Sequence, residues 1–460
     1  MSIDDSLGQV TSPPTSNDPG DSGHGVLPSI PEDEMRRARI AGGMGTMLEN
    51  IDMVLYSTAT AVVFNQLFFP NVSPAIGYIA SFGAYAVGFG ARPLGGFVFG
   101  HFGERLGRKF VMVATLFLMG TATFSMGLLP TYEQVGILAP ILLIVLRFIQ
   151  GFGAGAEMAS AVVLLTEFAQ KGRRGRTASW VWIGASIGFV IASLLWIGAQ
   201  RLLSDDALLS WGWRVIFMSS ILVTVAAWII RRTLKESPVF DAVKARRSKE
   251  AKAPIADVLA HGRRPLFRVF LMSYGVQTHS YIYNAFVGAY LIGTVGVNKS
   301  LIPNMLLLGG LVAAPGCYLV ARASDRFGRR SVNIAVMSLL LVFSAPAFLM
   351  LRTGVTWLIA IVYIIGFIFA VEGAVAAQAP TYAELFGSRY RFAGVALGRE
   401  LAAALGGGLA PFICAALLSA FSKSIWPIAI FMMVAAGISL IQLVMLPETV
   451  DRDLLTEADA

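Results

Sequence analysis

Long apolar runs follow one another along almost the whole sequence, and short polar segments separate them. We predict twelve membrane spans from these runs, each with the length of about 20 residues that a helix needs to cross a bilayer. In lipid, a lone segment can satisfy its backbone polar groups only as a helix. The sequence therefore predicts an all-α integral membrane protein with twelve transmembrane helices. The predicted spans are 40–68, 76–100, 110–129, 136–166, 177–203, 211–230, 267–293, 301–321, 332–351, 356–378, 392–420 and 425–446.

Composition excludes a soluble protein. Charged residues make up 14% of the chain and hydrophobic residues 56%, whereas soluble domains carry about 25% charged residues. The net charge of +8 comes from short loops beside the apolar runs, which is a topology pattern and not a nucleic-acid signal. We expect the lipid bilayer and a small organic solute as partners, no nucleic acid, and a monomer.

Lysine and arginine are distributed unevenly over the predicted loops. The loops on the side of both termini hold 28 of these residues, whereas the opposite loops hold Arg201, Lys299, Arg352 and Lys423. Basic residues accumulate in cytoplasmic loops. We therefore expect a multi-pass protein of the plasma (cell) membrane with both termini in the cytoplasm.

The chain repeats its own pattern after about half of its length. Residues 103–109, GERLGRK, return as SDRFGRR at 324–330. Such a repeat indicates two six-helix halves in parallel orientation, with a binding site at their interface near the membrane midplane. We predict five parts: a disordered acidic cytoplasmic tail 1–34, an N-terminal six-helix half 35–230, a basic cytoplasmic linker 231–266, a C-terminal six-helix half 267–447 and a short cytoplasmic tail 448–460.

The sequence carries no signature of an ATPase, a metal site or an enzyme. The motif GxxxxGK[ST] is absent, the four histidines are scattered, and Cys317 and Cys414 lie in apolar runs. We expect a secondary transporter that is not an enzyme, needs no cofactor or metal, and uses the proton as its coupling ion. An exporter of a cationic or aromatic compound and a non-transporting nutrient sensor remain alternatives.

Several charged side chains lie deep in the predicted spans, where each costs about 2.5–3.5 kcal/mol. Glu49 and Asp52 share one face of the first span because they are three residues apart. At least one carboxylate of such a pair binds a proton more readily than in water, so we predict that the pair couples transport to protons. The alternative is an ion pair with a buried arginine.

Polar side chains in the second and fourth spans extend this group. Arg147, Gln150 and Glu157 fall on one rough face of the fourth span and form either an internal network or a link between proton and solute. Arg92 stands before a PLGG turn, and its guanidinium can hold both oxygens of a solute carboxylate or of Glu49 or Asp52. We assign Glu157 to proton coupling and the two arginines with Gln150 to solute binding.

The seventh span carries a polar-aromatic stripe at helical spacing. A helix face in contact with lipid would be apolar. We therefore expect the polar stripe either to line a solute cavity or to form a hydrogen-bonded seam between helices. We assign its four members to solute binding: Tyr274, Gln277, Tyr281 and Asn284.

Together these motifs resemble the major facilitator superfamily and, within it, the metabolite:proton symporter family of osmoprotectant, α-ketoglutarate, shikimate and citrate permeases. The resemblance implies the major facilitator fold, proton symport of a carboxylate or zwitterion by alternating access, and a coupling role for the fourth-span motif. It rests on the two loop repeats and on Glu49-x-x-Asp52, RPLGG at 92–96, RFIQG at 147–151, WGWR at 211–214, ELF at 384–386 and Arg391-x-x-Gly394.

The eleventh span departs from this family at one place. It reads Gly398-Arg399-Glu400 where the family tends to have Gly-Tyr-Asn. Neighbouring residues on a helix do not face each other, so we expect Arg399 and Glu400 not to pair with one another and assign both to solute binding.

The two repeated loops are candidate gates. Alternating access rocks one half against the other, and a contact at these loops would hold one side shut. The acids of each loop either latch onto a neighbouring helix end or are merely solvated. We assign eight residues to gating: Glu104, Arg105, Gly107 and Arg108 in the first loop, and Asp325, Arg326, Gly328 and Arg329 in the second.

Overall fold

A computed structural model describes residues 32–106, 108–155, 157–170, 172–232, 254–387, 391–454 and 459. Within these ranges the chain forms helices and short connections, and strands are absent from the described residues. Most of the predicted tail 1–34 and of the linker 231–266 lies outside them, so the five-part division stays a prediction. The first helix begins at Glu32, and the described end of the linker forms α13 (Pro254–His261).

Six helical segments of the first half occupy the positions of the predicted spans. They are α1–η1–α2 (Glu32–Ala59, Thr60–Phe64, Asn65–Phe68), α3 (Pro74–Leu106), α4 (Arg108–Gly127), α6–α7 (Leu138–Ala154, Glu157–Phe168), α8 (Arg174–Leu202) and α9–η2–α10–α11 (Asp205–Ala207, Leu208–Gly212, Trp213–Met218, Ser220–Arg232). The short α5 (Tyr132–Val135) lies in the connection between α4 and α6.

The second half repeats this order. Its segments are α14–η3–α15–η4 (Arg263–Tyr281, Ile282–Phe286, Val287–Tyr290, Leu291–Val295), α16 (Leu301–Phe327), α17 (Arg329–Leu351), α18–η5–α19 (Thr356–Gly366, Phe367–Val371, Gly373–Leu385), α20–η6–α21 (Arg391–Ala402, Ala403–Gly408, Leu409–Ala420) and α22 (Trp426–Val444). Twelve spans in two six-helix halves, as predicted, are therefore present in the described chain.

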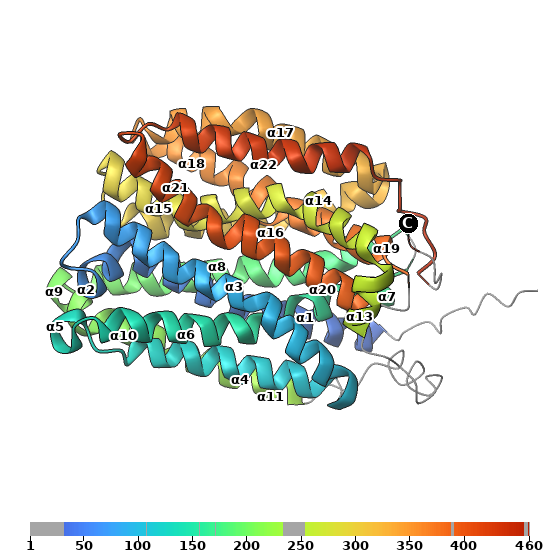
Figure 1. The fold of residues 1–460 in the computed structure, drawn as a ribbon, viewed down its shortest axis with the longest axis horizontal. Helices are drawn as coiled ribbons and strands as arrows, with labels where there is room; N and C mark the ends of the chain where they lie inside the picture. The colour runs from blue at the N-terminus through green and yellow to red at the C-terminus, as the bar shows by residue number, and fades with distance from the viewer. Residues whose placement is uncertain are drawn as a thin grey trace, which may run out of the picture.

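The two halves lie side by side with their helices roughly aligned (Figure 1). Across the interface α8 packs along α16, and α3 packs against α20, η6 and α21. We call the end of the bundle that carries residues 446–454 and the turns at 172–173 and 328 the basic end. The opposite end, with the turns at 203–204 and 296–300, is the far end.

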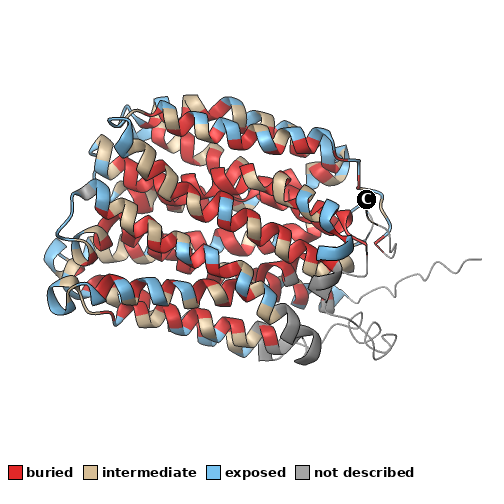
Figure 2. Cartoon of the chain, viewed as in Figure 1, coloured by how far each residue is buried: buried red, intermediate tan, exposed pale blue. Residues whose placement is uncertain are grey.

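The outer surface of the bundle is apolar, whereas its interior holds the buried side chains (Figure 2). Large aliphatic side chains such as Leu222, Val342 and Ile441 are mostly exposed along the outer helices. A soluble protein rarely exposes such a surface. Nine helical segments of the described chain are long and apolar enough to cross a membrane, so the protein is a multi-pass membrane protein.

Several spans are interrupted by a π-helical turn, in which the backbone carries one extra residue per turn. These turns include η1 in the first span, η3 in the seventh, η5 in the tenth and η6 in the eleventh. Two of them lie beside buried charges: η5 ends one residue before Glu372, and η6 begins three residues after Glu400. Hydrophobic periodicity gives no sign of such turns, because their residues are as apolar as those around them.

Candidate functional site

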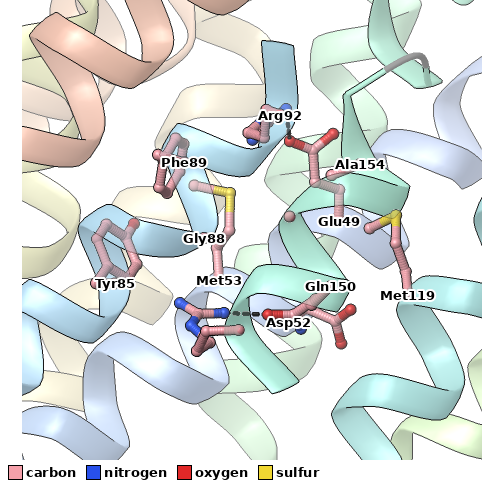
Figure 3. Close-up of a pocket in the computed structure, with 12 residues that line it drawn as sticks. Glu49, Asp52, Met53, Tyr85, Gly88, Phe89, Arg92, Met119, Gln150 and Ala154 are labelled. Atoms are coloured by element: carbon pink, nitrogen blue, oxygen red, sulfur yellow. Dashed lines mark hydrogen bonds and ion pairs between the residues drawn. The ribbon is translucent and has the colours of Figure 1, made fainter. Parts of the chain in front are cut away.

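A small cavity lies among α1, α3, α4 and α6, beside the interface between the halves. Its volume is ≈ 30 Å³, which is room for about two water molecules and far too little for an organic solute. Glu49 and Asp52 of α1 both line it, together with Arg92 of α3 and Arg147 and Gln150 of α6. Figure 3 shows the side chains of Glu49, Asp52, Arg92 and Gln150, which come from different helices. An organic solute therefore does not fit in this cavity in the state of the structure.

A chain of ion pairs connects the two halves above this cavity. Arg92 donates from Nη2 to Oε1 of Glu49 at 2.5 Å and from Nε to Oε2 of Glu400 at 2.7 Å. Glu400 in turn accepts from Nη1 of Arg399 at 2.5 Å through its other oxygen. All four side chains are buried. Two acids and two arginines therefore form a neutral chain, Glu49–Arg92–Glu400–Arg399, that joins α1 and α3 to α20.

This chain decides between two interpretations of the sequence. For Glu49 the ion pair with a buried arginine is present, so Arg92 is occupied by protein carboxylates in this state. The expectation that Arg399 and Glu400 do not pair was wrong. Adjacent helix positions point about 100° apart, but the long arginine side chain reaches round the helix to a carboxylate that Arg92 already holds in place.

Asp52 differs from Glu49 in having no such partner. Its carboxyl group is buried, and neither oxygen makes a hydrogen bond to a described residue. The polar side chains that act on it are Thr123 and Gln150, and its charged neighbours are Arg147 and, one turn away, Glu49. A buried carboxylate without a hydrogen-bonded partner is costly, so the surroundings of Asp52 compensate its charge less well than those of Glu49 compensate the charge of Glu49.

Arg147 contacts an aromatic ring and an amide, and it forms no hydrogen bond with Asp52. Its guanidinium carbon lies 3.5 Å from the centre of the Tyr56 ring, and Nη1 donates to Oε1 of Gln150. Gln150 in turn donates to Oγ1 of Thr123 at 2.5 Å. Arg147 and Gln150 thus form an internal polar network beside the cavity. Glu157 lies apart from it at the start of α7, where its carboxylate accepts a hydrogen bond from Thr115 at 3.2 Å.

The stripe predicted on the seventh span is divided by a π-turn. Tyr281 lies in the site, because its ring contacts Phe89 at 4.7 Å between centres and its hydroxyl reaches Sδ of Met53 at 3.9 Å. Tyr274 is only half-buried and packs against Phe270. Gln277 and Asn284 are buried, but η3 begins at Ile282 and adds a residue to the turn, so the stripe does not continue straight to Asn284.

At the basic end, Asp325 joins the two halves through the first turn of α8. Its oxygens accept from the backbone N–H groups of Gly175 and Arg176, each at 2.8 Å. A helix N-terminus offers free N–H groups and a partial positive charge, and here the capping acid comes from the other half. Asp325 is therefore not a solvated loop acid. We call this contact between the halves the latch, and its role in gating stays a prediction.

Arg329 and Glu384 extend this contact between the halves through further hydrogen bonds. Arg329 is fully buried and donates to Asp325 at 2.7 Å and to Glu384 at 3.2 Å. Glu384 also accepts from Arg174 of α8 at 3.3 Å. A second pair between the halves joins Arg391 to Glu167 at 3.3 Å. Glu384 and Arg391 were visible in the sequence as parts of the motifs ELF and Arg391-x-x-Gly394, but the motifs alone did not show which residues they contact.

The remaining gating predictions have different outcomes. Gly328 has φ +94° between α16 and α17, and a Cβ atom there would meet the carboxylate of Glu448, so glycine is required. Arg326 is exposed and lies over the ring of Phe327, outside the latch. In the first loop, Gly107 lies outside the described residues, as do the side chains of Glu104, Arg105 and Arg108, so their gating role stays a prediction.

Comparison with known proteins decides the family. A model of the Major Facilitator Superfamily matches residues 54–411, which is most of the chain. The chain belongs to the major facilitator superfamily. Two relatives place it among the metabolite transporters of that superfamily, so it is a membrane transporter and not an enzyme.

The first of these relatives is the shikimate transporter of Escherichia coli (strain K12). It is 35% identical over 409 residues, which cover 88% of this chain and 92% of that protein. The inner membrane metabolite transport protein YhjE of the same strain is 34% identical over 433 residues, covering 91% of this chain and 96% of that protein.

A solved structure shows the same fold. The xylose transporter XylE from E. coli, in a partially occluded inward open conformation, has a TM-score of 0.69 at 17% identity. The match covers 92% of this chain and the whole of that one. The two-half major facilitator architecture predicted from the sequence is thereby confirmed.

Proposed function

We propose that this major facilitator protein carries a small organic solute with a carboxylate or zwitterionic group by proton symport. The observation that carries the proposal is the contrast between two buried acids three residues apart. Glu49 is neutralised within an ion-paired chain, whereas Asp52 lines the same cavity without a hydrogen-bonded partner. A carboxyl group that is buried and unpaired when the site is closed, and hydrated when it opens, can take up a proton in one state and release it in another.

Solute recognition is assigned to the neutral chain. A solute carboxylate can displace Glu400 from Arg399, because both are planar carboxylates that suit the same guanidinium fork. Arg399 also lies over the ring of Trp182, with 5.6 Å between the guanidinium carbon and the ring centre, and its Nε has no partner among the described residues. Arg399 is thus the arginine with a free donor, whereas Arg92 is held by carboxylates from both halves.

We infer the orientation from the uneven loop charges. The basic end carries the latch, the C-terminal residues and most of the loop arginines, so we assign it to the cytoplasm and place the protein in the plasma membrane. In that orientation the closed latch separates the cavity from the cytoplasm. Solute would enter from the far end, where an exposed pair, Lys299–Asp205 at 2.6 Å, bridges the two halves.

The proposal is tested by uptake into proteoliposomes that contain the purified full-length protein. We expect one or more members of a panel of radiolabelled organic acids, betaines and amino acids, shikimate included, to accumulate when the external pH is lower than the internal pH. Accumulation should stop when a protonophore removes the gradient. Uptake that is identical with and without the gradient would contradict symport, and the absence of uptake for every class would contradict the assigned solute.

A further inference from the structure

Glu372 is a buried acid that the site described above does not use. It lies in the tenth span, where η5 ends at Val371 and before α19 begins at Gly373. Its side chain is 2% exposed. Its backbone N–H bonds to the carbonyl of Phe367 at 3.2 Å, and its own carbonyl accepts from Ala376 at 2.9 Å. The residue is thus fixed by its backbone at a break in the helix, and its side chain is available for another role.

The carboxyl group of Glu372 lacks the partner that its burial demands. Oε2 makes no hydrogen bond to a described residue. The titratable side chains that act on it are Glu49 from α1, Arg399 from α20 and the buried thiol of Cys317 from α16. Tyr283 of η3 packs nearby against Gly366, and its hydroxyl is likewise unpaired among the described residues.

The only arginine among these neighbours is already neutralised. Arg399 bonds to Glu400, which together with Glu49 and Arg92 completes the neutral chain. An ionised Glu372 would therefore add one uncompensated negative charge to a buried site. Burying a charge without a partner costs several kcal/mol. This cost exceeds the free energy that a carboxyl group gains by ionising near neutral pH, so the protonated form is favoured.

We propose that Glu372 is a second proton-carrying carboxyl group, on the side of the neutral chain away from Asp52. In the state of the structure Oε2 holds the proton. When the site opens, the O–H bond of Glu372 breaks, its proton passes to entering water, and Nε of Arg399 donates to the new carboxylate. The three acids and two arginines then carry one net negative charge, which the entering water hydrates. The inference rests on the proposed proton symport and adds a proton site in the second half.

A structural reading of Glu372 is less consistent with its surroundings. A structural acid in a helix break caps a helix end or joins two helices through hydrogen bonds, as Glu384 does with Arg329 and Arg174. Glu372 shows no such contact at Oε2, although Arg399 is near enough to act on it. Oε2 of Glu372 and Nε of Arg399 thus both lack a hydrogen-bonded partner among the described residues.

The test is infrared difference spectroscopy on the purified full-length protein, without solute, over a pH series. A protonated carboxylic acid has a carbonyl stretch that a carboxylate lacks, and that stretch shifts in D₂O. We expect the wild-type protein at neutral pH to show this band and Glu372→Gln to lack one of its components. A Glu372→Asp variant should retain that component at a shifted frequency.

Two matched variants complete the experiment. Glu133→Gln removes an exposed acid at the far end and should leave the band unchanged, whereas Asp52→Asn should remove a different component. A band identical in wild type and Glu372→Gln, with both proteins folded by thermal-stability measurement, would overturn the proposal. If Glu372→Gln does not fold, the unshifted band of Glu372→Asp would overturn it equally.

Transport gives a second readout. In proteoliposomes, the ratio of gradient-driven accumulation to solute exchange should fall at least about tenfold in Glu372→Gln, which corresponds to about 1.4 kcal/mol. The solute is the panel member that the wild-type protein accumulates best. Failure of the wild-type protein to respond to a pH gradient would contradict the proposed function, whereas a wild-type response that Glu372→Gln shares in full would contradict this inference alone.

Discussion

Replacing Asp52 by asparagine should abolish accumulation of solute against a gradient while the protein still folds. The substitution keeps the size and polarity of the side chain and removes a carboxyl group that makes no hydrogen bond to a described residue. Little stability depends on it, because no ion pair is broken. The variant, however, lacks the carboxyl group through which we propose that the pH gradient drives transport. Proteoliposome uptake with and without an imposed gradient, set beside a thermal-melting curve, measures both effects.

Glu49→Gln is the matched comparison, because it changes the other acid of the same helix face. It breaks a buried pair, and leaving one partner of such a pair uncompensated costs about 3–5 kcal/mol, so we expect loss of stability as well as of transport. The assignment of the proton to this face would be wrong if both variants still accumulated solute as the wild-type protein does.

Removing the Asp325 carboxylate should open the basic end. Asparagine at this position loses the charge that caps the first turn of α8 and leaves Arg329 with Glu384 as its remaining acid partner. Two conformations of a transporter differ by only a few kcal/mol, so a buried latch of this kind can reverse their populations. We expect Asp325→Asn to raise the population open at the basic end by at least about tenfold, equivalent to about 1.4 kcal/mol.

Spin labels at two exposed positions, Arg173 in the first half and Arg322 in the second, would report the separation of the halves. Asp205→Asn is the matched control, since it breaks the exposed pair with Lys299 at the far end. A surface pair is worth about 0–1 kcal/mol, so this control should leave the label distances unchanged. Wild-type distances in Asp325→Asn would show that the second loop is a topology signal and not a gate.

The sequence predicted the fold well because lipid leaves the backbone few choices. Each apolar run must be a helix, and the loop repeat at 103–109 and 324–330 indicates two related halves. The run boundaries agree with the helices to within several residues, the largest differences lying at helix ends such as Glu32, eight residues before the predicted span. The length of the apolar runs and the repeat of the loop sequence are therefore enough to predict the architecture.

The site was only partly predictable, because its contacts join residues far apart in the sequence. Buried charges could be recognised one by one, but their pairing depends on how the halves meet. Arg92 could have bound Glu49, Asp52 or a solute, and the structure shows that it binds Glu49 and Glu400 together. Regular α-helical spacing likewise does not predict the extra residue of η3. The stripe on the seventh span was therefore expected to continue along one face as far as Asn284, and it does not.

Proton movement caused by solute tests the central claim most directly. Proteoliposomes are prepared in weak buffer at equal internal and external pH, and the solute that the wild-type protein accumulates best is added outside. Symport carries protons inward with the solute, so the external pH should rise, and Asp52→Asn should eliminate that rise. Solute entry without any rise in external pH in the wild-type protein, or a fall in its place, would contradict the account.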